Sequence, residues 1–190
     1  YTLPVAEDAR TPVQPVIKIG WRDYASGEEF TPTALDGTPR EAVTAQAGRI
    51  AGNGQHLRNG RDINAVFSGA MRLNRADVAP QTAAAGDAIT VMLEWQALTR
   101  IHEDFTVLVH LIPVADLSPD SEHYQQPAAQ GDSPPRNERW PTSAWAVGVP
   151  FTDEHTIPLP DDLAEGDYRI AVGLYRPADF SRLPVETELD

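Results

Sequence analysis

The sequence predicts an all-β protein: an antiparallel β-sandwich with a jelly-roll-like path and one short inserted helix. Short stretches in which every second residue is apolar recur along most of the chain, which is typical of half-buried strands. Seventeen prolines and 13 glycines separate these stretches, as the turns of a sandwich or barrel require. A length of 190 residues is enough for one domain with a sizeable core.

Three stretches carry the clearest strand pattern. In residues 88–98, aliphatic residues and Trp95 collect on one face and polar residues on the other. Residues 105–112 are apolar on both faces, so we expect a central strand, joined to the previous one by a hairpin at 99–104. Residues 168–175 alternate again. Weaker patterns predict further strands at 13–19, 62–67, 155–159 and 183–187.

One segment favours a helix instead. The run TPRE at 38–41 offers a capping threonine, a proline at the first helical position and a glutamate two residues later. Val43, Ala47 and Ile50 then follow at a helical spacing. We therefore expect a helical insertion at about 39–51.

The prolines also suggest the domain organisation. Residues 1–12 contain two prolines and predict an extended arm, and residues 13–190 are expected to form a single sandwich domain. Within it, residues 113–151 show little periodicity and predict a long loop, of the kind that often carries function. The chain begins with Tyr1 rather than Met, so we expect a fragment or a processed product.

Composition excludes several classes of function. A net charge of −13 and a pI near 4.7 argue against nucleic acid and anionic membrane surfaces as partners. The absence of cysteine excludes disulfides, thiol catalysis and cysteine-ligated metals. Since no apolar run reaches membrane-spanning length, we expect contact with a membrane only through a parent chain.

The residues that could carry catalysis form no recognisable constellation. The adjacent carboxylates are typical of solvated turn acids, and a glycosidase pair across a cleft remains a remote alternative. The five histidines form neither His-x-His nor His-Glu-x-x-His, although 102–104 and 153–155 leave a structural calcium or zinc site open. No Gly-x-Ser-x-Gly motif is present. We predict no catalytic residue, no metal ligand and no cofactor.

The long loop does contain sugar-binding chemistry. Carbohydrate modules stack pyranose rings on exposed aromatic side chains and bind the hydroxyls with acids and amides. Trp140, Trp145, Tyr124 and Asp132 are therefore the candidate sugar-binding residues. The alternative is that the two tryptophans fold the loop down onto the sandwich.

The C-terminal two thirds also resembles a known family. The ordered motifs that carry the resemblance are GD (86–87) with VMLEWQ (91–96), DFTVLVHL (104–111), QGDSPP (130–135), WPTSAW (140–145) with Gly148, DEH (153–155), GDYR (166–169), VGLY (172–175) and RLP (182–184). Over residues 62–187 this series resembles the C-terminal β-sandwich module of bacterial multi-pass membrane proteins of the dolichyl-phosphate-mannose or aminoarabinose transferase type. The resemblance implies an extracytoplasmic, cell-surface or membrane-tethered location.

The resemblance also implies that the membrane part of the parent protein and this domain have different roles. The transfer chemistry would lie in the membrane part of a parent glycosyltransferase, so the domain itself is expected to be no enzyme. We expect a non-catalytic module that binds or positions carbohydrate or a lipid-linked sugar. A purely structural or protein–protein interaction domain is the alternative, and a glycan-active hydrolase is a third, weaker one.

Overall fold

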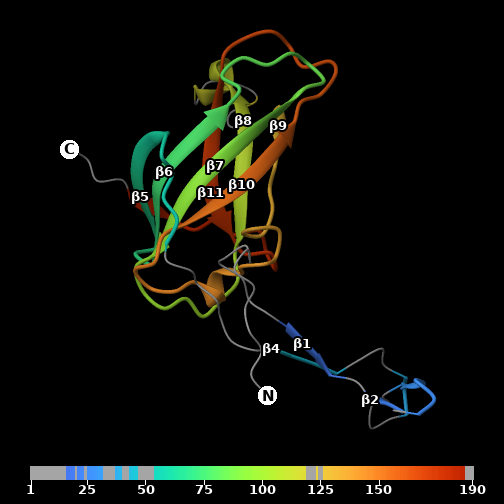
Figure 1. Ribbon diagram of the computed structural model, residues 1–190. Helices are drawn as coiled ribbons and strands as arrows, with labels where there is room; N and C mark the ends of the chain where they lie inside the picture. The colour runs from blue at the N-terminus through green and yellow to red at the C-terminus, as the bar shows by residue number, and fades with distance from the viewer. Residues whose placement is uncertain are drawn as a thin grey trace. The chain divides into compact units, whose positions relative to one another are not determined.

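The computed structural model describes residues 16–19, 21–23, 25–31, 37–39, 43–46, 54–118, 123 and 126–186 (Figure 1). The chain divides into two compact units, residues 1–50 and 51–190, which are treated separately below. The predicted arm at 1–12 lies outside the described residues. None of the helices in the described part is long and apolar enough to cross a membrane.

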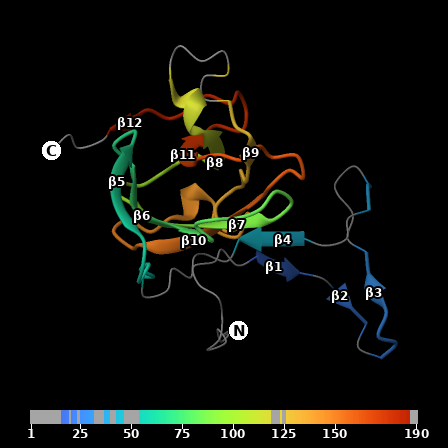
Figure 2. The same ribbon diagram turned by 90° about the horizontal axis from the view of Figure 1, so that it is seen from above.

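The larger unit is an all-β sandwich, as predicted, although the jelly-roll path stays a prediction. Its five-stranded antiparallel sheet has the order β10 (Phe151–Pro158), β7 (Ala88–Ala97), β6 (Met71–Ala79), β5 (Arg61–Phe67), β12 (Val185–Glu186). The second sheet has the order β11 (Tyr168–Tyr175), β8 (Thr106–Pro113), β9 (Ala129–Gln130). Seen from above, β6 and β7 lie on one side of the sandwich, opposite β8 and β11 (Figure 2).

The core lies between these sheets and follows the alternation of the sequence. On β7, Val91, Leu93 and Trp95 are fully buried, and on β8 Val107 and Val109 are fully buried. Each large apolar side chain buried in this way contributes about 1.5–3 kcal/mol relative to leaving it exposed. The inner faces of the two most regular strands therefore form the centre of the molecule.

The connection between β7 and β8 differs from the sequence prediction. The hairpin expected at 99–104 is wrong, because the two strands lie in different sheets and this segment crosses from one to the other. The apolar faces of the two strands meet across the core instead of pairing edge to edge. The prediction of a central strand is confirmed, since β8 lies between β9 and β11.

Strand β6 has no counterpart among the predicted strands. A register shift between Leu73 and Arg75 marks a bulge in its pairing with β7. Met71 and Leu73 point inward before the bulge. After it, Ala76 and Val78 point inward, one residue later than strict alternation would place them. Strict alternation is lost at that point, and a search for period two therefore misses the strand.

The smaller unit contains two short antiparallel pairs. Strand β1 (Val16–Ile19) pairs with β4 (Val43–Gln46), and β2 (Trp21–Arg22) pairs with β3 (Glu29–Phe30). The helix predicted at 39–51 is therefore wrong over β4. The helical spacing rested on three apolar residues only. The β-branched residues at 43 and 44 favour a strand, and this strand pairs with β1, which is distant in sequence.

In the described parts, helical structure is limited to two short 3₁₀ turns. They are η1 (Val114–Leu117) and η2 (Thr142–Ala144), and both lie in the long loop between β8 and β10. The structure thus divides the predicted loop at 113–151 into the end of β8, η1, β9, η2 and the first residue of β10. Much of this segment is held against the sheets by side chains that the sequence marked as candidates for function.

Candidate functional site

The two loop tryptophans are core residues, so their predicted role as exposed sugar platforms is wrong. Trp140 is 1% exposed and Trp145 is 2% exposed. The Trp145 ring packs against Trp95 and Phe151 at centroid distances of 5.8 and 4.8 Å, and its indole N–H donates to the carbonyl of Trp140. The alternative, that they fold the loop onto the sandwich, is what the structure contains. Tyr124 lies outside the described residues.

Asp132 fastens the same loop to β8. Its carboxylate accepts a hydrogen bond from the Val109 N–H at 2.9 Å and lies 3.3 Å from His110 Nε2. The side chain is 19% exposed. A carboxylate with two intramolecular partners holds the loop in place, and neither Trp140 nor Trp145 offers an open surface to a sugar.

A buried polar bracket links the loop to β10. His155 Nε2 lies 2.8 Å from Asp153 Oδ2, and both side chains are fully buried. On the other side of the ring, Nδ1 lies 3.0 Å from Ser133 Oγ and 3.2 Å from the Gly131 carbonyl oxygen. The Arg136 N–H donates to the second oxygen of Asp153 at 2.8 Å. Residues 131–136 are thereby bound to the inner face of β10.

The surroundings of His155 raise its pKa. Burial by itself lowers the pKa of His155, but the hydrogen bond and negative charge of Asp153, with the Gly131 carbonyl and the charge of Asp132, raise it above its ordinary value. Both ring nitrogens contact groups of the domain itself, and through these contacts the Asp153–His155–Ser133 group clamps residues 131–136 to β10.

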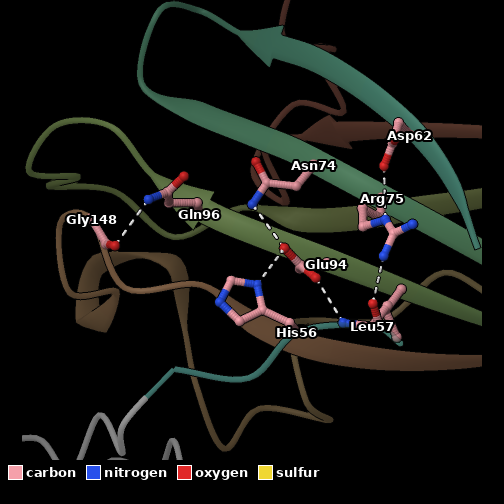
Figure 3. A network of polar contacts seen from close by, with 8 residues as sticks. All are labelled: His56, Leu57, Asp62, Asn74, Arg75, Glu94, Gln96 and Gly148. Atoms are coloured by element: carbon pink, nitrogen blue, oxygen red, sulfur yellow. Dashed lines mark hydrogen bonds and ion pairs between the residues drawn. The ribbon is translucent and has the colours of Figure 1, made fainter. Parts of the chain in front are cut away.

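A second buried carboxylate holds the segment that enters the sandwich. Glu94, on the outer face of β7, is 2% exposed and accepts the Leu57 N–H at 2.7 Å and the Asn74 side-chain amide at 3.1 Å (Figure 3). His56 Nδ1 lies 3.2 Å from the same carboxylate. Arg75 donates to the Leu57 carbonyl at 2.7 Å. Residues 54–60 are thus fixed along the outer face of the five-stranded sheet.

No group of three or more His, Asp or Glu side chains among the described residues is arranged to hold a metal ion. Four of the six acids and histidines in the two candidate segments make other contacts. Glu103 pairs with Arg176 at 2.8 Å, and Asp104 accepts the Ser143 N–H at 2.9 Å. Asp153 and His155 form the clamp described above.

The open feature of the sandwich is a cleft between its sheets, on the side of β5 and β11. Its volume is about 1340 Å³. The five-stranded sheet contributes Ile63, Phe67 and Val78, and β11 contributes Ile170 and Val172. These β11 residues are only partly buried although they face inward, because the sheets do not close over them.

The rim of the cleft is polar. It contains the charged residues Arg61, Asp77, Glu165, Asp167 and Arg169. Arg61 lies opposite Ala76 in the pairing of β5 with β6, so both side chains project from the inner face of the sheet. A guanidinium therefore stands at the edge of an apolar wall. Apolar walls with a few polar groups at the rim are the usual composition of a small-molecule site.

Comparison of the chain with protein-family models, curated proteins and solved structures finds no match. The candidate site therefore rests on geometry. The predicted sugar-binding residues Trp140, Trp145 and Asp132 hold the loop, and the cleft is built from strand and loop residues that the sequence did not mark as candidates for function. The sequence contained one signal for the cleft. Residues 168–175 have aliphatic side chains at inward positions, and the strand that they form, β11, lies at the edge of its sheet.

Proposed function

We propose that this domain is a non-catalytic, extracytoplasmic binding module of a membrane glycosyltransferase-like protein. It holds the apolar part of a lipid-linked ligand in the cleft between its two sheets. The observation that carries the proposal is the cleft itself, whose volume is about 1340 Å³ and whose lining combines an aliphatic and aromatic wall with polar and charged residues. The membrane setting rests on the resemblance of residues 62–187.

The contacts of the motif side chains support a role without catalysis. The carboxylates of Asp132 and Asp153 and the imidazole of His155 are all engaged in contacts within the domain. Each of these side chains fixes one part of the loop on the sandwich. The cleft lies apart from these clamps and is lined mainly by carbon.

The cleft suits a chain-like lipid with a polar head. Burying apolar surface contributes roughly 25 cal/mol per Å², so an alkyl or isoprenyl chain would be favoured between Phe67 and Val172. Arg61 at the rim offers a cation to a phosphate or carboxylate head. Asp77, Glu165 and Asp167 line the same rim, so an anionic head would lie beside Arg61 and away from these carboxylates.

A filled cleft tests the binding site. The probes are a fluorescent 16-carbon fatty acid and a short-chain polyprenyl phosphate, each titrated into the full chain. Ala76→Phe adds a ring to the cleft wall, and the matched control Ala115→Phe adds one to exposed η1. We expect saturable binding that weakens about tenfold or more in Ala76→Phe and is unchanged in the control.

A second variant guards against misfolding of the first. Ile63 is 38% exposed at the cleft, so Ile63→Glu places a charge there at little cost to folding. Equal binding by wild type and both cleft variants would overturn the proposed site.

For the membrane setting, an antibody to the domain should detect a membrane-bound band far heavier than 20.7 kDa in source cells. A free band of that mass would overturn the setting alone.

A further inference from the structure

A loop outside the cleft presents an aromatic ring to solvent. Phe180 lies in the turn between β11 and β12 and is 74% exposed, the highest value among the large apolar side chains of the described residues. Its ring stacks on Tyr175 with a centroid distance of 5.8 Å and an interplanar angle of 27°. Neither residue lines the cleft. An exposed ring in a stacked pair offers a flat apolar surface with a fixed orientation.

The backbone holds this ring outward at a cost in free energy. Phe180 has φ of 58°, a left-handed conformation that is an outlier for a bulky residue. The conformation persists because the Phe180 N–H donates to the Arg176 carbonyl at 2.9 Å and the Arg176 N–H donates to the Ser181 carbonyl at 3.0 Å. Strain of this kind, maintained by surrounding contacts, occurs preferentially at functional sites.

Polar groups are fixed in the same loop. Asp179 accepts hydrogen bonds from the N–H and the hydroxyl of Ser181 at 2.9 and 2.6 Å, and these bonds lower the pKa of Asp179, so its carboxylate is ionised. Arg176 pairs with Glu103 at 2.8 Å and lies 5.7 Å from the Phe105 ring centre. Two carboxylates and a guanidinium are thus ordered in the loop and its support before any ligand arrives.

We infer that the 176–182 loop is a carbohydrate-binding site, in which a pyranose ring stacks on Phe180 and its hydroxyls bind Asp179 and Arg176. The C–H face of a pyranose matches a flat aromatic surface, and carboxylate and guanidinium groups bind vicinal hydroxyls. A protein partner would need a larger apolar centre, whereas the exposed residues of the same loop, Pro177, Ala178, Asp179 and Arg182, are small or polar.

The test is an NMR titration of the full ¹⁵N-labelled chain with four soluble probes: mannohexaose, cellohexaose, chitohexaose and xylohexaose. We expect at least one probe to shift the amide signals of residues 175–182 at concentrations on the order of millimolar. Phe180→Gly removes the ring and suits the positive φ, so the fold should remain while affinity falls about tenfold or more. Phe180→Trp, with a larger stacking surface, should retain binding.

The control is Val147→Ala, because Val147 is another exposed apolar residue, at 54%, in a different loop. Its affinity for the probes should equal that of wild type. Unchanged spectra with all four saccharides would overturn the inference and would leave a protein contact as the explanation for the ring. Equal affinity in Phe180→Gly would overturn it as well. Either result leaves the lipid-binding cleft untouched, since its probes and variants are separate.

Discussion

Replacing Asp153 with asparagine tests the clamp that holds the long loop. The variant keeps the shape of the side chain but removes the charge that faces His155 at 2.8 Å in a fully buried pair. At about pH 6, below the raised pKa of His155, the pair is charged, and breaking a buried ion pair by removing one partner costs about 3–5 kcal/mol. The stability of a whole domain is only about 5–15 kcal/mol, so the variant should be conspicuously weakened.

The assay is chemical denaturation of wild type and variant, followed by tryptophan fluorescence. For a domain of this size, about 3–5 kcal/mol corresponds to a fall in Tm of about 6–20 °C, which thermal denaturation would detect. Glu154→Gln is the matched control, because Glu154 is the exposed neighbour on the same strand, and it should change stability by no more than about 0.5 kcal/mol. A loss below about 1 kcal/mol in Asp153→Asn would refute the clamp.

The same clamp predicts a pH dependence. The folded-state pKa of His155 is raised above its unfolded value, mainly because Asp153 outweighs the effect of burial. Its contribution to stability is therefore fully present below about pH 6.5, and it is lost as the pH rises through the folded-state pKa. Denaturation curves measured from pH 6 upward should show this loss in wild type and a smaller one in Asp153→Asn. Parallel pH profiles would contradict a raised pKa of His155 that depends on Asp153.

Three further variants test other parts of the account. Trp145→Ala should cost about 3–5 kcal/mol of unfolding free energy in denaturant titrations, whereas an exposed tryptophan would cost little. Glu94→Ala leaves the Leu57 N–H without its carboxylate, so we expect a loss of about 1–3 kcal/mol and faster amide exchange at 55–57; unchanged exchange would count against the role of Glu94. Gly131→Ala places a Cβ 2.5 Å from the carbonyl oxygen of Thr156, and a normal Tm would show that the loop can move away from β10.

The strands were predictable where one rule governed them. Residues 168–175 form β11 with the predicted bounds, and β7 ends one residue short of its predicted range, because uninterrupted alternation and burial agree there. Strand β6 was not predictable, since a bulge breaks its alternation. The helix prediction at 39–51 failed for the opposite reason. A local helical pattern was present, but β4 pairs with β1, and a local pattern does not show which distant segment will be the partner.

The candidate sites show the same limit more sharply. Trp140 and Trp145 have the residue type of a sugar platform, but residue type does not reveal whether a ring is buried, and here both rings fill the core. Phe180 drew no attention in the sequence, because its exposure and its positive φ depend on the closure of one loop. The cleft likewise depends on how far apart two sheet edges lie, which no alternation pattern encodes.

The most direct test of the central claim is an NMR measurement of where a bound lipid chain lies. With methyl-labelled protein and the 16-carbon probe, the account predicts nuclear Overhauser contacts from the chain to Ile63, Ile170 and Val172, which line the cleft. It also predicts none to Val147, an exposed valine outside the cleft. Contacts confined to surface methyls such as Val147, or no contacts at saturating probe, would contradict a lipid-binding cleft between the sheets.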